Sequence, residues 1–377
     1  LSDNIFSVDI FDVPCDNIIH EKTINMKTDI SIIIPVYNPP HDMFERCIKS
    51  LISQTGDMGV EFIFVNDGST DTWIAEKLER LEMDDSRVVV ITKENEGLSV
   101  ARNTGMKRAR GEYIAFCDAD DAYETDAFEY MFHMVTEQNA DAAVFGVSRE
   151  NFKYEKEAAS VVDCQTKRNM LLSILSYRTA IYSQKGLIID STWAKLFRHE
   201  IIKEHGLRFD KTLCVSEDAL FCAEFYEYAD TIVLDNKQVY QYIVNEDSLT
   251  RKYKKEYNAM IPRLIKKEMD FIGRYHQGDA AFEESVAIRT FVALTHADHC
   301  YFIPRMKENG VASEMRELWN DRTIHVAVKR NTFALLKANA FGSANYYMRL
   351  LIYKYKLVKV FSLMAKAILA FRKTKGK

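Results

Sequence analysis

The stretch Glu-Tyr-Ile-Ala-Phe-Cys-Asp-Ala-Asp-Asp at residues 112–121 combines the two features on which the interpretation of this chain depends. Residues 113–117 are apolar and favour β-structure, so they predict a short buried strand. Asp118, Asp120 and Asp121 follow it directly. Carboxylates repel one another and resist burial, so this cluster favours a divalent cation bound together with a phosphorylated ligand. The alternative is an Asp-rich turn before the next helix, and Asp121 is interpreted as such a helix-start acid.

Apolar runs of this kind alternate with helical patterns through the first 150 residues. Strands are predicted at residues 30–36, 60–65, 87–92, 113–117 and 142–147. Helices are predicted between them, at residues 42–54, 70–83, 98–109 and 124–139. Strands and helices that alternate with short loops predict an α/β fold with a mainly parallel sheet and helices on both faces.

Polar and turn-forming residues follow four of the predicted strands. They are Tyr37 and Asn38, residues 67–69, Asn95 and Gly97, and residues 118–121. Because sheets of this class bind ligands at the carboxyl ends of their strands, we expect these residues to form one site. The chain has no Gly-x-Gly-x-x-Gly and no Gly-Lys-Ser/Thr motif. A phosphorylated ligand would therefore be held by a metal ion and basic side chains.

The alternation weakens after about residue 150, and the rest of the chain is predicted to be mostly helical. Helices are expected at residues 166–185, 198–205 and 216–228, and strands at residues 231–235 and 238–244. From residue 252 onward the pattern is helical. We expect an N-terminal extension (1–28), a catalytic domain (29–250) and a helical C-terminal region (251–377).

Charge is unevenly distributed along the chain. The 377 residues carry a net charge of −5, yet the last 56 residues contain 13 Lys and Arg and no Asp or Glu. The acidic remainder and the lack of a recognition motif disfavour nucleic-acid binding. Seven scattered cysteines without a Cys-x-x-Cys pair indicate a reducing compartment. No apolar run reaches the ~18 residues needed to span a bilayer.

The basic end of the chain has the pattern of an amphipathic helix over residues 346–373. Basic residues recur there at spacings of three and seven positions, which places them along one stripe, and large apolar residues occupy the rest of the helix. This pattern favours a peripheral anchor on anionic lipid at the cytoplasmic face of the cell membrane. The alternative is a helix docked on the acidic catalytic domain.

Four motifs together resemble those of the inverting family 2 glycosyltransferases of the GT-A fold, of the bacterial polysaccharide and glycolipid type. They are Ile-Ile-Ile-Pro-Val-Tyr-Asn at residues 32–38, Val-Asn-Asp-Gly-Ser-Thr-Asp at 65–71, Asn-Glu-Gly at 95–97 with Ala-Arg-Asn at 101–103, and Asp-Ala-Asp-Asp at 118–121. The resemblance covers roughly residues 29–250 and is specific for the family, though not for a sugar. It implies a nucleotide-sugar donor, a GT-A sheet and a Mn²⁺ or Mg²⁺ cofactor.

The resemblance implies a donor side that holds the nucleotide, its sugar and the metal ion. The implied donor-binding residues are Pro35, Tyr37, Asn38, Asp67, Gly97, Arg102, Asp118 and Ala119, and the implied metal ligand is Asp120. A hard cation held by carboxylates stabilises the charge that develops on the departing nucleoside diphosphate. Some relatives add a histidine to the metal. The nearest histidine after the acidic pair is His276, so few protein ligands are expected, and Arg251 or Lys252 would help to neutralise the diphosphate.

The resemblance also implies an acceptor side about a hundred residues later. Glu217 and Asp218 match the family's acidic pair, with Asp218 as the general base and its pKa raised by Glu217. Trp193 and Lys195 match an acceptor-side segment. Taken singly, such residues have structural explanations, such as first-turn acids favoured by the helix dipole. Their joint order along the chain favours the functional interpretation.

The sequence therefore predicts a metal-dependent inverting hexosyl- or N-acetylhexosaminyl-transferase. It would move a sugar from a UDP-sugar to a hydroxyl of a polysaccharide or lipid-linked glycan. One alternative is a sugar-phosphate nucleotidyltransferase, which the missing glycine-rich phosphate loop disfavours. Another is a catalytically degenerate sugar- or lipid-binding module, which the intact Asp120 and Asp218 disfavour.

Overall fold

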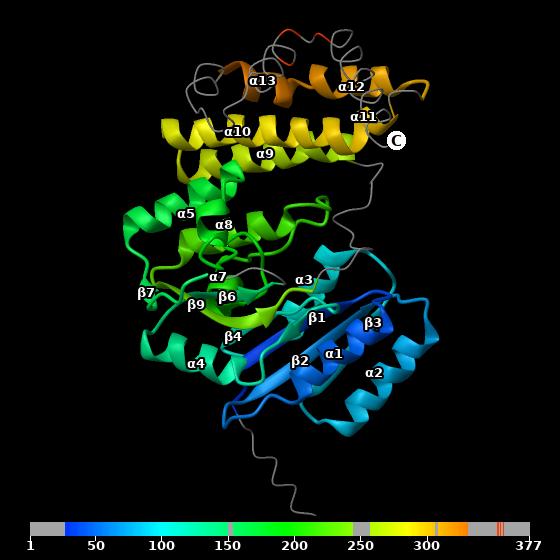
Figure 1. Ribbon diagram of the computed structural model, residues 1–377, viewed down its shortest axis with the longest axis vertical. Helices are drawn as coiled ribbons and strands as arrows, with labels where there is room; N and C mark the ends of the chain where they lie inside the picture. The colour runs from blue at the N-terminus through cyan, green and yellow to red at the C-terminus, as the bar shows by residue number, and fades with distance from the viewer. Residues whose placement is uncertain are drawn as a thin grey trace, which may run out of the picture.

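The computed structural model describes residues 27–149, 154–243, 257–305 and 308–330, together with Tyr353, Tyr355 and Leu357. Figure 1 shows a sheet flanked by helices, with further layers of helices stacked beyond it. The predicted α/β fold with a mainly parallel sheet and a helical C-terminal region is confirmed. The strand order is β3-β2-β1-β4-β8-β6-β9-β5, with β7 also paired to β9.

The first four long strands form the parallel half of the sheet. They are β1 (Ile30–Val36), β2 (Val60–Asp67), β3 (Val88–Lys93) and β4 (Tyr113–Phe116). Every residue of β1 is buried because helices cover both faces, and this burial explains why the strand is apolar except for Ser31, whose hydroxyl donates to Glu61. Since these strands are parallel, their carboxyl ends lie along one edge of the sheet.

Alternate residues of β1 point to two different helix layers. Ile32 and Ile34 pack in one apolar cluster with α1 (His41–Ile52), α2 (Thr72–Asp84) and α4 (Ala127–Glu137). Ile33 packs in the other, which contains α3 (Leu98–Arg108), α5 (Cys164–Ser176) and α8 (Glu217–Tyr228). This second cluster continues into α9 (Tyr257–Tyr275) and α10 (Ala280–Ala297). The C-terminal helices therefore share a core with the sheet.

The second half of the sheet is mixed and departs from the prediction in two places. Residues 195–198, for which no strand is predicted, form β8 (Lys195–Arg198), which lies antiparallel between β4 and β6 (Ala142–Ser148). The two strands expected between residues 231 and 244 form one strand, β9 (Ile232–Gln241), with an irregular register. Short strands β5 (Ala122–Tyr123) and β7 (Ser160–Val161) both pair antiparallel with β9.

The helix expected at residues 166–185 is broken. α5 ends at Ser176 and is followed by Tyr177, whose φ of 57° is left-handed, and α6 (Ala180–Ser183) forms a separate turn. The remaining helical elements are α7 (His199–Glu204), a π-helical turn (Asp298–Phe302), α11 (Ile303–Arg305), α12 (Val311–Asn320) and α13 (Arg322–Arg330). Of these, α12 and α13 lie beyond α9 and α10 in Figure 1, whereas α7 lies beside β8 and α8.

Several predictions fall on parts of the chain that the structure does not describe. These are the N-terminal extension up to residue 26, the boundary near residue 250 and all but three residues of the predicted basic helix at 346–373. The domain boundaries therefore stay predictions.

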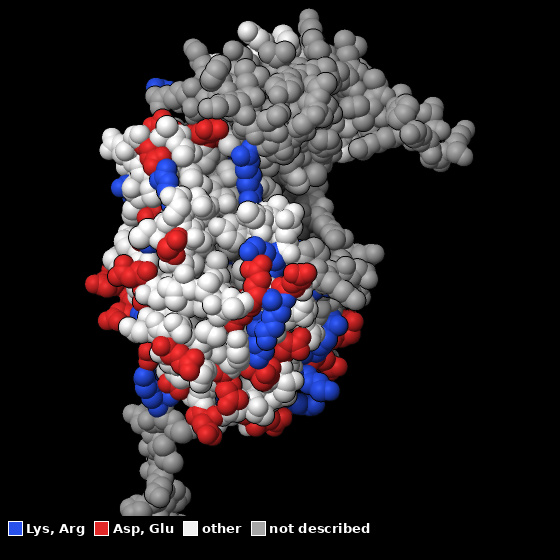
Figure 2. All heavy atoms as spheres, turned by 60° about the vertical axis from the view of Figure 1, so that its left-hand side comes forward, with Lys and Arg blue, Asp and Glu red and all other residues white. Residues whose placement is uncertain are grey.

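Figure 2 shows one face of the molecule. On the part of this face formed by the sheet and its flanking helices, many acidic side chains are exposed, with basic side chains between them. Among the described helices, none is long and apolar enough to cross a membrane.

Candidate functional site

Asp67, at the end of β2, is buried and holds the turn that begins α3. Its carboxylate accepts hydrogen bonds from the backbone N–H groups of Glu96 (3.1 Å) and Gly97 (2.8 Å) and lies 2.7 Å from the Lys93 ammonium. Gly97 has φ 93°, a conformation that side chains disfavour. The strand end and this turn, predicted as neighbours from the sequence, are thus joined through one carboxylate.

The end of β1 presents a second pair of predicted donor residues. Asn38 accepts from the Thr70 N–H (2.9 Å) and donates to the Thr70 hydroxyl (3.1 Å), so it ties the loops after β1 and β2 together. Tyr37 next to it is 50% exposed, and Pro35 is buried within β1. The half-exposed ring is the side chain in this group best suited to stack on a base.

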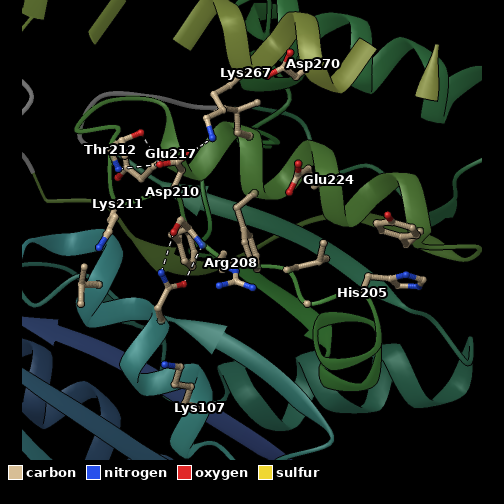
Figure 3. Close-up of a pocket in the computed structure, with 18 of the residues that line it drawn as sticks. Lys107, His205, Arg208, Asp210, Lys211, Thr212, Glu217, Glu224, Lys267 and Asp270 are labelled. Atoms are coloured by element: carbon tan, nitrogen blue, oxygen red, sulfur yellow. Dashed lines mark hydrogen bonds and ion pairs between the residues drawn. The ribbon is translucent and has the colours of Figure 1, made fainter. Parts of the chain in front are cut away.

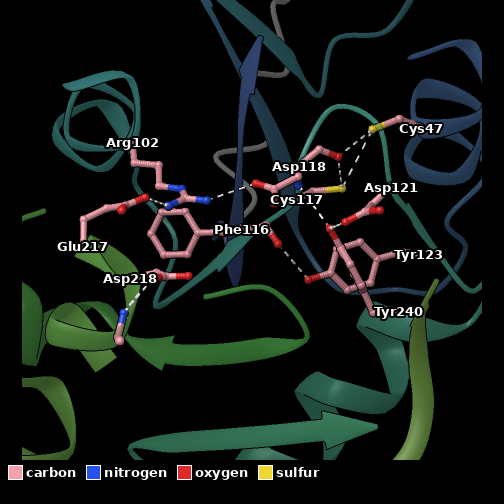
Figure 4. Close-up of polar contacts among 11 residues, drawn as sticks. Cys47, Arg102, Phe116, Cys117, Asp118, Asp121, Tyr123, Glu217, Asp218 and Tyr240 are labelled. Carbon is pink, nitrogen blue, oxygen red and sulfur yellow. Dashed lines mark hydrogen bonds and ion pairs between the residues drawn. The ribbon is translucent and has the colours of Figure 1, made fainter. Parts of the chain in front are cut away.

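Arg102 of α3 connects the two halves of the predicted site (Figure 4). Its guanidinium donates to Asp118 (3.0 Å) and to Glu217 (3.4 Å) and lies 5.2 Å from the ring centre of Phe209. The side chain is 3% exposed. A buried cation is stable only when it is paired, and here the two carboxylates come from strand ends and helices far apart in sequence. Arg102 is therefore not a solvated charge on the surface of α3.

Asp218 lies in the first turn of α8, beside Glu217, and accepts a hydrogen bond from the Ala219 N–H (2.8 Å). Burial raises the pKa of Asp218 to about 7, with Glu217 adding to the rise and Arg102 opposing it. The effect of Glu217 has the predicted direction, although burial is the larger cause. Asp190, which the sequence analysis did not single out, raises this pKa further. A carboxylate with a pKa near 7 suits a general base at neutral pH.

The Asp cluster after β4 divides into two parts. Asp118 and Asp120 are partly exposed, whereas Asp121 is 2% exposed and accepts hydrogen bonds from the Tyr240 hydroxyl (2.8 Å) and the Ile243 N–H (2.8 Å). The Tyr240 hydroxyl in turn accepts from the Asp118 N–H (3.2 Å). Asp121 as a helix-start acid is therefore wrong, since α4 begins only at residue 127. Its two hydrogen bonds instead hold the C-terminal end of β9 next to the Asp cluster.

The side chains of Asp118 and Asp120 offer oxygen atoms of the type that a hard cation prefers. Burial raises the pKa of Asp121 to about 8, and the negative charges of Asp118 and Asp120 add to the rise. Two acidic neighbours that repel a third carboxylate mark a position that a cation would stabilise. Within the described part of the chain, no group of three or more His, Cys, Asp or Glu residues could hold a metal by itself. Oxygens of a donor diphosphate would have to complete the coordination.

Of the three residues considered as further help for the metal or diphosphate, the structure describes only His276, and it lies elsewhere. His276 contacts the Glu227 carboxylate and stacks on the Phe282 ring at 3.5 Å, between the end of α8 and α10. Arg251 and Lys252 lie outside the described residues.

Trp193 and Lys195, the predicted acceptor-side residues, are both buried. The rings of Trp193 and Tyr240 are stacked, with their centres 5.1 Å apart and an interplanar angle of 3°. The Lys195 ammonium contacts the backbone oxygens of Ile188 and Trp193 and the Ser191 hydroxyl, and burial lowers its pKa. These contacts shape the loop before β8, and direct contact with an acceptor stays a prediction.

A groove of about 830 Å³ lies behind the Arg102–Glu217 pair, between α3, the loop at residues 205–212, α8 and α9 (Figure 3). Among the predicted site residues it contains only Glu217. Its lining includes the cations Lys107, Arg208, Lys211, Lys267 and Arg274 and the acids Glu96, Asp210, Glu217, Glu224 and Asp270. Charges of both signs balance there, so the groove does not favour an anion over a neutral ligand.

Comparisons with known proteins agree with this architecture. Residues 31–206 match the model of glycosyl transferase family 2. The chain is 33% identical over 227 residues to the glycosyltransferase GlyA of Streptococcus pneumoniae serotype 4, which covers 59% of this chain but only 31% of GlyA. It is 32% identical over 257 residues to the uncharacterized glycosyltransferase EpsJ of Bacillus subtilis strain 168, which covers 68% of this chain and 73% of EpsJ.

Among solved structures, the fold is similar to that of S. aureus TarS residues 1–349 in complex with UDP-GlcNAc. The TM-score is 0.64 at 18% sequence identity, and the match covers 91% of this chain and 92% of that one. The agreement of the motifs, the sheet and the match to most of EpsJ identifies this chain as a member of glycosyltransferase family 2.

Proposed function

We propose that this protein is a metal-dependent inverting glycosyltransferase that moves a hexosyl or N-acetylhexosaminyl group from a UDP-sugar to an acceptor hydroxyl. The observation that carries the proposal is the Arg102 guanidinium, which contacts Asp118 on the donor side and Glu217 beside Asp218. One buried cation thereby links a donor-side carboxylate to Glu217, the chain neighbour of Asp218, whose pKa suits a base.

In the proposed reaction, the acceptor oxygen attacks the anomeric carbon as the bond from that carbon to the diphosphate oxygen breaks. Asp218 takes the hydroxyl proton, and the nucleoside diphosphate leaves with the bonding electrons. A single displacement of this kind inverts the anomeric carbon. A Mn²⁺ or Mg²⁺ ion on Asp120 would stabilise the charge on the leaving diphosphate.

The donor would lie along the strand ends, with its base near Tyr37 and Asp67 and its ribose and sugar near Asp118 and Ala119. The half-exposed Tyr37 ring supports this placement. So does the fold shared with TarS, whose structure contains UDP-GlcNAc. Gly97 brings the backbone of the α3 turn close to the same place without a side chain in the way.

The acceptor is proposed to be a growing polysaccharide or a lipid-linked glycan, approached from the side of Asp218, Trp193 and Lys195. Membrane contact through residues 346–373 belongs to the same proposal and rests on the sequence pattern, since these residues lie almost wholly outside the described part. Membership of glycosyltransferase family 2 favours sugar transfer over the nucleotidyltransferase alternative.

Removing the metal is expected to stop the reaction. Chelation with EDTA should reduce UDP-sugar turnover at least 100-fold, and added Mn²⁺ or Mg²⁺ should restore it, since the cation stabilises the leaving group. Asp120→Asn should lower turnover similarly and raise the Mn²⁺ concentration needed for half-maximal rate. The measurement is UDP release from a panel of UDP-sugars during titration with metal.

Asp126→Asn is the control, because Asp126 lies only six residues after Asp120, beyond β5, and pairs with Lys237 (3.1 Å). It should retain turnover within about twofold and an unchanged Mn²⁺ requirement. Turnover that is indifferent to EDTA, or an Asp120→Asn variant with the wild-type metal requirement, would contradict the metal role of Asp120.

A further inference from the structure

The residue before the acidic pair, Ser216, has a backbone conformation that needs support. Its φ of 65° and ψ of 17° are left-handed, which residues with a Cβ disfavour. Its side chain does not cap the helix that it precedes. Because Glu217 and Asp218 follow immediately, this turn sets the direction in which both carboxylates leave the chain.

The support comes from Arg289 of α10, in the C-terminal helical region. Its guanidinium donates to the Ser216 hydroxyl at 2.5 Å, and the side chain is 4% exposed. The same guanidinium lies 4.7 Å from the ring centre of Tyr177. Tyr177, at the end of α5, is also left-handed, with φ 57°. One cation therefore contacts two strained residues on different elements.

A buried carboxylate holds Arg289 in this place. Glu268 of α9 lies 3.1 Å from the Arg289 Nε and is 2% exposed. Burial raises the pKa of Glu268 to about 8, and the Arg289 charge opposes this rise. A buried Arg–Glu pair is costly compared with apolar packing, so its presence points to a geometric role.

We infer that Arg289 is a positioning residue for catalysis, which fixes the turn at Ser216 and thereby the directions of Glu217 and Asp218. The inference rests on the proposed function, because the positioned carboxylate is the proposed base. Through Arg289, helix α10 of the C-terminal region contributes to the geometry of the catalytic site. Nothing in the sequence pattern singles out Arg289.

The test compares Arg289→Gln with wild-type protein by the rate of transfer at saturating UDP-sugar and Mn²⁺. Misplacing a catalytic group costs roughly 10- to 100-fold in kcat, with the donor KM unchanged. Arg168→Gln is the control: Arg168 also forms an ion pair with a carboxylate beside α10, Asp279 (2.6 Å), and lies over the Phe282 ring, although this pair is more exposed than Arg289–Glu268. It should stay within about twofold of wild type.

Rescue separates positioning from a general loss of structure. Glycine adopts left-handed backbone readily, so Ser216→Gly combined with Arg289→Gln should recover much of the lost rate. Ser216→Ala removes only the hydroxyl that Arg289 contacts, and several-fold lower kcat is expected even if Arg289→Gln does not fold. Wild-type kcat in Ser216→Ala and in a folded Arg289→Gln variant would overturn the inference.

The titration of Asp218 gives a readout that does not depend on turnover. The groups that face Asp218 are Glu217 and Cys222 on its own helix and Arg102, Asp190 and Lys195 on the elements packed around it. Loosening the Ser216 turn should admit water and move the carboxyl ¹³C titration midpoint of Asp218 from about 7 toward the ordinary aspartate value. An unchanged midpoint in Arg289→Gln overturns the inference, whereas an inactive wild-type protein contradicts the proposed function alone.

Discussion

Replacing Asp218 by asparagine is expected to lower the rate of sugar transfer about 10²- to 10⁴-fold, the usual contribution of a general base. Asparagine has nearly the same shape, and its amide oxygen can still accept from the Ala219 N–H. Because Asp218 belongs to the acceptor side, donor affinity should not change. The measurement pairs the transfer rate at pH 8 with the Kd of UDP-sugar and Mn²⁺ from calorimetry.

Glu224→Gln provides the control from the same helix. Glu224 lies two turns further along α8 and pairs with Arg274 at 2.5 Å, away from Arg102 and the Asp cluster. Its transfer rate should stay within about twofold of wild type. An Asp218→Asn variant with near-wild-type transfer and unchanged donor affinity would remove Asp218 from the role of base.

Arg102→Met is expected to destabilise the protein by about 3–5 kcal/mol, because it leaves Glu217 as an unpaired buried carboxylate beside Asp218. Methionine retains much of the apolar volume against Phe209, so the loss should arise from charge and not from a cavity. Urea unfolding would give the change in the free energy of unfolding. Transfer should fall as well, since the link between Asp118 and Glu217 is broken.

Two further variants separate the charge effect from other causes. Adding Glu217→Gln to Arg102→Met removes the unpaired charge and should recover a large part of the stability without restoring transfer. Lys77→Gln breaks an exposed pair with Glu45 (3.4 Å) and should cost less than about 1 kcal/mol. If Arg102→Met lowered the free energy of unfolding no more than Lys77→Gln does, the buried Arg102 cation would not be what stabilises the site.

The parallel half of the fold could be predicted from sequence because each strand there is covered on both faces. The predicted bounds of β1 match the observed ones, since its seven buried residues are all apolar except Ser31. The carboxyl ends of parallel strands necessarily share one edge of the sheet. The order of strands and helices along the chain was therefore enough to predict that Asp67 lies near the Gly97 turn. The resemblance to a family then supplied the distant partner, Glu217 and Asp218.

The other half depended on contacts that local sequence does not encode. β8 has four residues, and a run that short is consistent with a strand or with the approach to a helix. The burial of Asp121 depends on Tyr240, which lies 119 positions later and closes over it. The burial of Lys195 likewise depends on backbone oxygens of its own loop, which only the folded chain brings around its ammonium.

The central claim is that Asp218 takes the acceptor's proton in a site whose other half is the Asp118–Asp120 donor side. The most direct test is the pH dependence of transfer from pH 5 to 9 in wild type and Asp218→Asn. Because the base must be ionised, the wild-type rate should rise with unit slope and level off above an apparent pKa of about 7. The variant should be slow and lack this rise. A variant that keeps the same pH-dependent rise, or a wild-type rate that is level down to pH 5, would contradict the account.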